Sequence, residues 1–473
     1  MTKTAIHPLE QNRVQSSLVL DKFLLPLAAC AFALIVSPLL IVLSSEGPDT
    51  KTLTGAMAVR YENKVFWPAL LALTVIVVFR HRERLSRASF PPNIICLFLY
   101  LGFAGFSVLW AFKPELSSIR FAQQVMIVLS AVLPTMMAVR SADVLRGLFL
   151  CFAFACILSF FFTLGATPLI VDKVAVGYTG HFPNKNYLGA CAALTIILSL
   201  YEMRHRGFRR VFAMAIAVIA VLLLFWGNSK TAMGLMLLAP TLAACALILR
   251  RVFGASLLTI PVLLLLLYVA LTLVSNFDVY RISYYLYGES TFTGRKMIWD
   301  FVNYEIGRKP LLGWGYQSFW LVGPDAPSIL DAPGWVKTMP NGHNGYLDTI
   351  VELGYVGFAL LLSFVTLTVH ACGRLADRDP FRGWIVLSLV AFIVISNGLE
   401  SWWMRAFEYL WVLFLILAAE IGRHWVRYAP RPHRGQPVGA ARRMGPVPSR
   451  VEGHPARRRP PNIGTGRATT WDA

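Results

Sequence analysis

The sequence is poor in charged residues, and especially in acidic ones. Only 15% of its 473 residues are charged, with 25 Asp and Glu against 44 Lys and Arg, whereas 56% are hydrophobic. A water-soluble chain of ordinary composition cannot hide so large an apolar share inside its own core. The composition therefore excludes an ordinary soluble enzyme, and a lipid bilayer is the expected solvent.

The long loops lack cysteine. All seven cysteines fall inside or at the ends of apolar stretches: Cys30, Cys96, Cys151, Cys156, Cys191, Cys245 and Cys372. This placement argues against a disulfide framework and against a thiolate metal site. A cleavable signal peptide is not expected either, because the first apolar run begins only at Phe23, after a long polar lead.

Long apolar runs without charge recur along the chain and predict an all-α polytopic membrane protein with about 12 transmembrane helices. Nine runs are charge-free: 23–45, 88–112, 121–139, 147–171, 211–229, 231–249, 252–277, 353–373 and 383–399. Three shorter runs, 65–79, 186–201 and 409–419, need their flanks to complete a span.

The basic residues sort by connection, which predicts the orientation of the helices. The even-numbered connections carry most of them: Arg80, Arg82, Arg84, Arg87, Arg140, Arg146, Arg204, Arg206, Arg209, Arg210, Arg250, Arg251, Arg374, Arg378 and Arg382. These connections and both termini are expected on the cytoplasmic side of a bacterial inner membrane. The basic residues behind the net charge of +19 are expected to interact with anionic lipid headgroups, and nucleic acid is not an expected partner.

Five regions follow from this pattern. They are a cytoplasmic segment 1–22, nine transmembrane helices in 23–275, a large periplasmic loop 276–345, three further helices in 346–424 and a basic cytoplasmic tail 425–473. The tail is rich in Arg, Pro and Gly, has almost nothing to bury and is predicted to be disordered.

The large loop contains TGRKMIWDFVNYEIGRKP, which has the apolar period of a short amphipathic helix closed by Pro310. We expect this helix on the outer membrane surface. Arg295 lies in its first turn, where a helix N-terminus favours anions and a guanidinium can hold two phosphate oxygens. The alternative is an interfacial anchor whose charge reaches the lipid headgroups.

Further candidate site residues map to the same predicted outer face. His343 and Asn344 lead into the tenth helix, and a histidine there can exchange a proton near neutral pH; a purely structural hydrogen bond is the alternative. The others are His181, Lys185 and Asn186 before the sixth helix, Lys230 at the start of the eighth and Arg120 at the start of the fourth. A cluster of cations without nearby carboxylates suits a departing pyrophosphate.

Two patterns that contain acidic residues are interpreted as structural and not as part of the active site. Asp377 and Asp379 form an Asp-x-Asp, but it lies on the predicted cytoplasmic face and is interpreted as a charge-balanced loop. No outer loop offers ligands at metal spacing, so the predicted chemistry uses neither a metal nor a cofactor. Arg405 and Glu408 are three residues apart and are interpreted as a helical ion pair.

The segments WAFKPELSSIR, GHFPNKNYLG, NSKTAMG, TGRKMIWDF with PLLGWGY, and GHNGYLDTIVELGYVGF occur in this order along residues 95–420. In this order the chain resembles the O-antigen ligase and polymerase superfamily, most closely exopolysaccharide polymerases of the ExoQ type. Where that family has an HKN-like and a Ser-Arg-Thr-like element, this chain has Asn184-Lys185-Asn186 and Ser229-Lys230-Thr231. Lysine keeps the charge of arginine but loses its two-pronged fork.

The resemblance implies a GT-C-like glycosyltransferase that acts in the periplasm on undecaprenyl-diphosphate-linked oligosaccharides and transfers them to a growing glycan. His343, Arg295 and Lys230 are the predicted catalytic residues: Lys230 and Arg295 bind the diphosphate while His343 orients or deprotonates the acceptor, and one displacement inverts the anomeric carbon. The predicted substrate-binding residues are Lys185, Asn186, Asn344, Arg120 and His181. A chain-length regulator and a flippase of the same pathway are expected partners.

Two other functions fit the sequence less well. The first is an O-antigen ligase, which moves finished glycan onto a lipid A core with the same site chemistry. The second is a transporter of glycan or lipid-linked glycan. A transporter is expected to carry ionisable residues near the membrane midplane within repeated bundles, whereas these runs are nearly charge-free and show no internal repeat.

Overall fold

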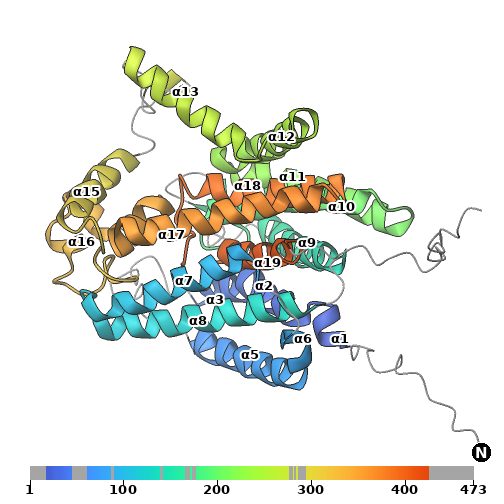
Figure 1. The fold of residues 1–473 in the computed structure, drawn as a ribbon, viewed down its shortest axis with the longest axis horizontal. Helices are drawn as coiled ribbons and strands as arrows, with labels where there is room; N and C mark the ends of the chain where they lie inside the picture. The colour runs from blue at the N-terminus through green and yellow to red at the C-terminus, as the bar shows by residue number, and fades with distance from the viewer. Residues whose placement is uncertain are drawn as a thin grey trace, which may run out of the picture. The chain divides into compact units, whose positions relative to one another are not determined.

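The computed structural model describes residues 17–44, 61–86, 90–138, 142–165, 171–172, 177–275, 281, 284–285 and 294–425. These residues form a bundle of long helices with one antiparallel pair of two-residue strands, β1 (Val171–Asp172) and β2 (Gly177–Tyr178) (Figure 1). The prediction of an all-α polytopic membrane protein is confirmed. Most of the predicted segment 1–22, residues 276–293 of the large loop apart from 281 and 284–285, and nearly all of the tail 425–473 lie outside the described residues.

Within the described part, nine helical stretches are long and apolar enough to cross a membrane. They are Leu24–Leu43, which contains α2 (Leu24–Ala31) and α3 (Ser37–Leu43), α5 (Tyr61–Arg80), α7 (Pro92–Phe106) with a 3-10 turn to Trp110, α8 (Pro114–Met137), α9 (Ala142–Leu164), α10 (Lys185–Met203), α11 (Phe208–Gly227), α12 (Lys230–Phe253) and α17 (Gly345–Ala376). Three shorter apolar helices, α13 (Thr259–Ser275), α18 (Pro380–Ser396) and α19 (Tyr409–Gly422), coincide with predicted spans.

The core of the bundle surrounds α19. All fourteen residues of this helix, including Glu420, are buried, although a short and mostly apolar run would suit a lipid-facing position equally well. It contacts α2, α7, α8, α17 and α18. By contrast, no residue of α13 is buried, and Figure 1 shows this helix projecting from α12.

Helix α17 is interrupted where another segment crosses it. Gly354 has a φ of 65° and no helical conformation, and a Cβ atom there would lie 2.0 Å from the carbonyl oxygen of Leu311. The backbone of PLLGWGY crosses α17 at this interruption. Trp314 N donates to Val351 O at 2.9 Å, and Gly315 N donates to Glu352 O at 2.8 Å. The glycine-rich turn of the sequence is therefore a crossing that fixes the large loop against the bundle.

The predicted amphipathic helix is present as α15 (Arg295–Arg308), but its apolar face does not lie on a membrane surface. Ile298, Phe301, Val302 and Ile306 are at most 6% exposed and belong to a second hydrophobic core, separate from that of the bundle. This core also holds Trp314, Phe319, Trp320, Val336, Ile350 and Val351. The expectation of a surface-lying helix is wrong because that face is buried against other parts of the loop, including the 3-10 helix Gly334–Thr338, and against Ile350 and Val351 of α17. The loop also contains the short α16 (Pro327–Leu330).

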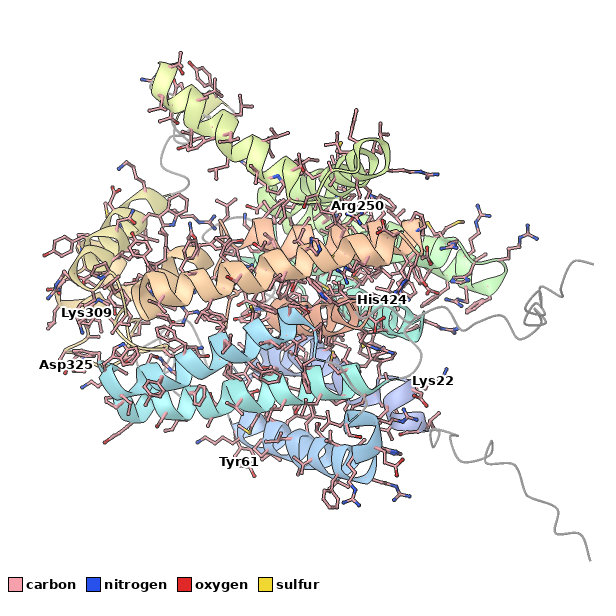
Figure 2. All side chains as sticks on the ribbon, viewed as in Figure 1. Lys22, Tyr61, Arg250, Lys309, Asp325 and His424 are labelled. Carbon is pink, nitrogen blue, oxygen red and sulfur yellow. The ribbon has the colours of Figure 1, made fainter. Side chains whose placement is uncertain are left out.

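The two ends of the bundle carry different segments. Figure 2 shows Lys309 and Asp325 at the end formed by α15 and α16, and Lys22 and His424 at the opposite end. Ion pairs tie the basic connections together at that opposite end: Arg84–Asp21, Arg204–Asp379, Arg250–Asp377 and Arg382–Glu420. Asp377 and Asp379 thus have basic partners, and Asp379 also caps α18. That this end faces the cytoplasm stays a prediction.

Candidate active site

Three segments from distant parts of the chain converge on the carboxylate of Glu400. Arg295 Nη2 lies 2.7 Å from Glu400 Oε1, and His343 Nδ1 lies 3.2 Å from Glu400 Oε2. Asn186 Nδ2 donates to Oε1 at 2.9 Å. The side chains of Glu400, Arg295 and His343 are 12%, 14% and 30% exposed. We call Glu400, Arg295, His343 and Asn186 the Glu400 cluster; its members are held in place but reachable.

The backbone around His343 is held tightly on both sides. Gly345, the first residue of α17, donates its N–H to Glu400 O at 2.9 Å, and a Cβ atom there would lie 2.4 Å from Asn397 Oδ1. His343 itself has a φ of 47°, which is unusual for a residue with a side chain. On the other side, Trp299 of α15 donates its indole N–H to Gly342 O at 3.0 Å. The positions of Arg295 and His343 are therefore coupled through rigid backbone.

The first turn of α10 and the start of α12 complete this region. Asn184 caps α10 by accepting the backbone N–H groups of Asn186 and Tyr187. Ser229 Oγ donates to Asn186 Oδ1 at 3.1 Å, and Lys230 follows as the first residue of α12 with an exposed side chain. Lys185 Nζ donates to Asn228 O at 3.3 Å. The two lysines therefore start neighbouring helices at the same end of the bundle as Glu400.

The side chains of Asn344 and His181 already form hydrogen bonds within the protein. Asn344 is the N-cap of α17, and its side-chain oxygen accepts the N–H groups of Tyr346 and Leu347. His181 is fully buried: Nδ1 lies 2.7 Å from Ser159 Oγ, and Nε2 lies 3.1 Å from Leu34 O. Burial lowers the pKa of His181 to about 4. The structure brings neither residue into the Glu400 cluster by a direct contact.

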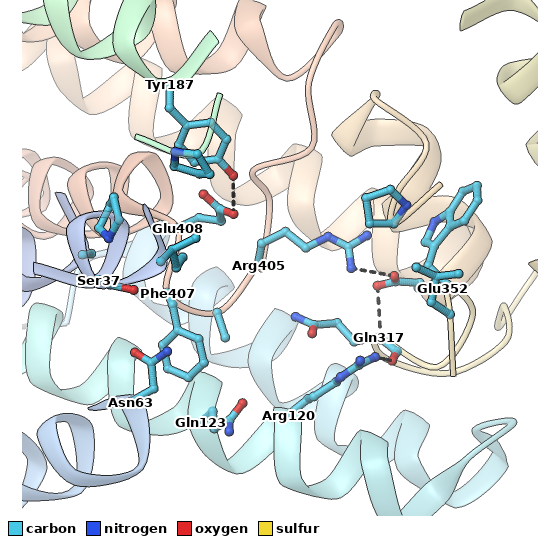
Figure 3. A pocket seen from close by; sticks show the side chains of 18 residues that line it. Ser37, Asn63, Arg120, Gln123, Tyr187, Gln317, Glu352, Arg405, Phe407 and Glu408 are labelled. Atoms are coloured by element: carbon cyan, nitrogen blue, oxygen red, sulfur yellow. Dashed lines mark hydrogen bonds and ion pairs between the residues drawn. The ribbon is translucent and has the colours of Figure 1, made fainter. Parts of the chain in front are cut away.

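Arg120 lines a separate polar pocket of about 320 Å³, which we call the Arg405 pocket (Figure 3). At its wall, Arg405 lies 2.9 Å from Glu352 Oε1 and 3.1 Å from Asp348 Oδ2. Although burial lowers the pKa of Arg405, these two carboxylates raise it above its ordinary value. The polar side chains that line the pocket are Ser37, Asn63, Arg120, Gln123, Tyr187, Gln317, Glu352, Arg405 and Glu408.

A second carboxylate of this pocket is protonatable near neutral pH. Glu408 accepts a hydrogen bond from Tyr187 Oη at 2.6 Å, and burial raises the pKa of Glu408 to about 7. The predicted helical pair of Arg405 and Glu408 is wrong, because the chain between α18 and α19 is not helical there and each side chain has another partner. Tyr187 follows Asn186 in the chain, so it connects the pocket with the Glu400 cluster.

The expectation of cations without nearby carboxylates is also wrong. Of the predicted residues, Arg295, His343 and Asn186 meet directly, and they meet on an acid. Glu400, Arg405 and Glu408 lie between α18 and α19, in a segment that sequence reasoning considered only in part. One sequence feature could have pointed to Glu400: it directly follows an apolar run, on the predicted outer face, where charged residues are scarce.

Comparison with known proteins finds one matching family and several relatives. The sequence pattern of the O-antigen ligase family matches residues 215–362, which include Lys230, Arg295 and His343. The exopolysaccharide production protein ExoQ of Rhizobium meliloti (strain 1021) is 26% identical over 324 residues, 65% of this chain and 72% of that protein. The resemblance to the O-antigen ligase and polymerase superfamily is confirmed.

Shorter matches are to proteins that are named polysaccharide ligases. A protein of Rickettsia bellii (strain RML369-C) named a polysaccharide ligase is 30% identical over 128 residues, 26% of this chain and 31% of that protein. Its namesake from Rickettsia felis (strain ATCC VR-1525 / URRWXCal2) is 26% identical over 141 residues, 33% of its length. The chain thus spans about a third of these relatives. The chain is therefore similar to polysaccharide ligases and to an exopolysaccharide production protein, and its apolar helices are those of a membrane protein.

Proposed function

We propose that this protein is an inverting glycosyltransferase that polymerises undecaprenyl-diphosphate-linked repeat units into exopolysaccharide on the periplasmic face of the inner membrane. The observation that carries the proposal is the meeting of Arg295, His343 and Asn186 on Glu400. A proton acceptor and a phosphate-binding cation then lie on opposite sides of one carboxylate, at the end of the bundle where the large loop is anchored.

Glu400 prepares His343 to act as a base. With Nδ1–H donated to Glu400 Oε2 at 3.2 Å, the imidazole is held in one tautomer and Nε2 becomes the proton acceptor. In the reaction, the acceptor hydroxyl oxygen forms a bond to the anomeric carbon while its proton passes to Nε2. The bond from that carbon to the diphosphate oxygen breaks, and the diphosphate leaves with the electron pair. One displacement inverts the carbon.

Arg295 and Lys230 would stabilise the charge that grows on the departing diphosphate. A guanidinium has five N–H donors, and the contact with Glu400 uses one of its nitrogens, so the others can hold phosphate oxygens. Lys185 and Lys230, at the starts of α10 and α12, would add positive charge beside N-terminal helix ends that already favour anions. These cations supply the role that a metal ion plays elsewhere, so the proposed reaction is metal-independent.

The Arg405 pocket would hold sugar of the acceptor. Amide, guanidinium and carboxylate groups that converge on one concave site, with Trp320, Tyr187 and Phe407 also lining it, suit hydroxyl-rich rings with apolar faces. Arg120 would act here and not on the diphosphate, because it lines this pocket and donates to Gln317 O. The donor would reach the site from the surrounding lipid after a flippase has turned it outward, and a chain-length regulator remains an expected partner.

The decisive experiment incubates purified protein in lipid nanodiscs with lipid-linked repeat unit in a buffer that contains a chelator. We expect the repeat units to be joined and the lipid diphosphate to be released. Elongation that stops in chelator and returns with a divalent cation would overturn the metal-independent mechanism. Movement of labelled lipid-linked glycan across proteoliposomes without any elongation would establish a transporter instead.

A ligase is the second candidate, favoured by the family pattern and by the names of the Rickettsia relatives. It would use the same cluster but move finished glycan onto a lipid A core. Deletion of the gene in its host separates the two functions. Loss of secreted polymer supports the polymerase, whereas intact polymer with an unmodified lipid A core supports the ligase.

A further inference from the structure

A groove on the outer side of α15 is distinct from both the Glu400 cluster and the Arg405 pocket. It has a volume of about 560 Å³ and lies between α15 and the segment Asp331–Trp335. Lys296, Asp300 and Tyr304 are spaced four residues apart and line it from one side of α15. Opposite them are Asp331, Pro333 and Trp335. The groove is thus bounded by two segments that the second hydrophobic core holds together.

Two aromatic side chains in this groove are left unusually open. Trp335 is 44% exposed and Tyr304 is 64% exposed, although Val336 and Val302 beside them are fully buried. Rings of this size normally contribute to a core or to a binding surface, because their exposure to water is costly. Trp335 is also fixed in place: a Cβ atom on Gly294 would lie 3.3 Å from its ring, so the indole packs on the backbone next to Arg295.

The groove combines these rings with acceptors. Asp300 and Asp331 are 57% and 41% exposed, and each forms one ion pair, with Lys296 at 2.6 Å and with Arg308 at 2.6 Å. A carboxylate accepts about four hydrogen bonds, so both retain the capacity to accept more. Pyranose rings present apolar C–H faces to aromatic rings and hydroxyl groups to carboxylates. From this pattern we infer that the groove binds a segment of the growing glycan outside the reacting end.

A membrane surface is a poorer occupant than a glycan. The apolar face of α15 is already used by the loop's own core, so the exposed side is not the one that a surface helix would insert. Membrane anchors combine aromatic rings with Lys and Arg, whereas this groove has two Asp and one Lys in its lining. Anionic headgroups would be repelled by such a lining.

The inference rests on the proposed glycosyltransferase function and adds a retention site to it. A second contact keeps the product near the cluster and raises the effective concentration of its end, without taking part in the chemistry. Because Gly294 and Trp335 at the edge of the groove adjoin Arg295, a chain leaving the Glu400 cluster can enter the groove directly. The number of additions per encounter should then depend on the groove, whereas the rate of a single addition should not.

Trp335→Ala tests this directly, with Tyr355→Ala, an aromatic side chain 51% exposed and outside the groove, as the matched control. In the nanodisc assay we expect Trp335→Ala to shorten the modal polymer several-fold while the initial rate of the first addition stays within about twofold. Trp335→Phe should restore length. Unchanged length with Trp335→Ala, or equal shortening with Tyr355→Ala, would overturn the groove.

Two binding measurements separate this inference from the proposed function and from the membrane alternative. Oligosaccharide of several repeat units, released from the host's polymer and free of lipid, should bind Trp335→Ala about tenfold more weakly than the unchanged protein. This result does not require turnover, so it stands even if no elongation is seen. Equal binding by both overturns the groove. The part of the tryptophan fluorescence that is lost in Trp335→Phe comes from this indole. If brominated lipid quenches that part, the indole lies in the membrane and the groove is likewise overturned.

Discussion

The Glu400 cluster and the Arg405 pocket are built from the same kinds of group in opposite arrangement. In the first, one carboxylate holds an arginine and a histidine; in the second, one arginine is held by two carboxylates. The outer members of the first are 14% and 30% exposed, whereas Asp348 and Glu352 are only 3% and 7% exposed. Ionic contacts at the same end of one bundle thus differ in what solvent and substrate can reach.

This difference in exposure suggests different roles for the two sites, catalysis for the Glu400 cluster and structural stabilisation for Arg405 and its two carboxylates. A reachable histidine on a carboxylate can take up and release a proton, and a reachable guanidinium can exchange one anion for another. An arginine between two buried carboxylates can do neither, because removing it leaves both charges without compensation. We therefore expect substitutions in the Glu400 cluster to change the rate of the reaction, and substitutions of Arg405 to change the stability of the fold.

The largest effect on activity should come from His343→Gln. Glutamine keeps a polar side chain but cannot act as a base, so elongation should fall by about 10²–10⁴-fold. The amount of folded protein in the membrane should change little. His205→Gln, between α10 and α11 at the opposite end of the bundle, is the control and should elongate normally. Near-normal polymer yield from His343→Gln would show that another group takes the proton.

Arg405→Met should act on folding instead. Loss of the guanidinium leaves Asp348 and Glu352 buried together, at a cost of about 3–5 kcal/mol in the free energy of unfolding. Lys113→Met is the matched control, because its pair with Asp325 is exposed on both sides and should contribute little to stability. Both are measured by thermal unfolding in detergent. Arg405→Met protein that is as stable as the control would mean that the pocket tolerates unpaired acids.

The sequence was sufficient to predict the helices but not the pairing of their ends. Apolar length predicted the spans, and a period of 3.6 residues predicted α15, because both properties are local. Glu400 meets Arg295 and Asn186 across 105 and 214 residues of chain. No local period encodes such a contact. Family motifs pointed to Arg295 and His343, yet the acid between them emerged only from the fold.

The apolar face of α15 shows the second limit of the sequence. Its period predicted that one face must be buried, but not what would cover it. Trp314, Phe319 and Val336 lie within the same loop and supply a core of their own. An amphipathic pattern near a membrane does not distinguish lipid from protein as the partner, since both remove the same apolar area from water.

Glu408→Gln should produce a smaller, pH-dependent change in the Arg405 pocket. The pKa of Glu408 is raised to about 7, so its contribution to stability is full below about pH 4.5 and is lost as the pH rises through 7. Glutamine cannot ionise, so it gains no buried charge as the pH rises, and it keeps an oxygen for the Tyr187 hydroxyl. The variant should therefore be more stable at pH 8, on the order of 3 kcal/mol, and nearly unchanged at pH 4. Thermal unfolding at the two pH values measures this, with the exposed Glu115→Gln as control; an equal gain at both would contradict the titration of Glu408.

The smallest effects should come from the two helix caps beside the Glu400 cluster. Asn184→Ala and Asn344→Ala each remove acceptors for two backbone N–H groups, so each should cost about 1 kcal/mol. Asn344→Ser should recover most of that stability, because serine also caps helices. If Asn344 only caps α17, elongation by Asn344→Ser will follow its stability. A stable Asn344→Ser protein whose elongation falls as far as that of His343→Gln would instead make Asn344 a substrate ligand, and the reachable part of the site would then extend beyond Glu400 to the start of α17.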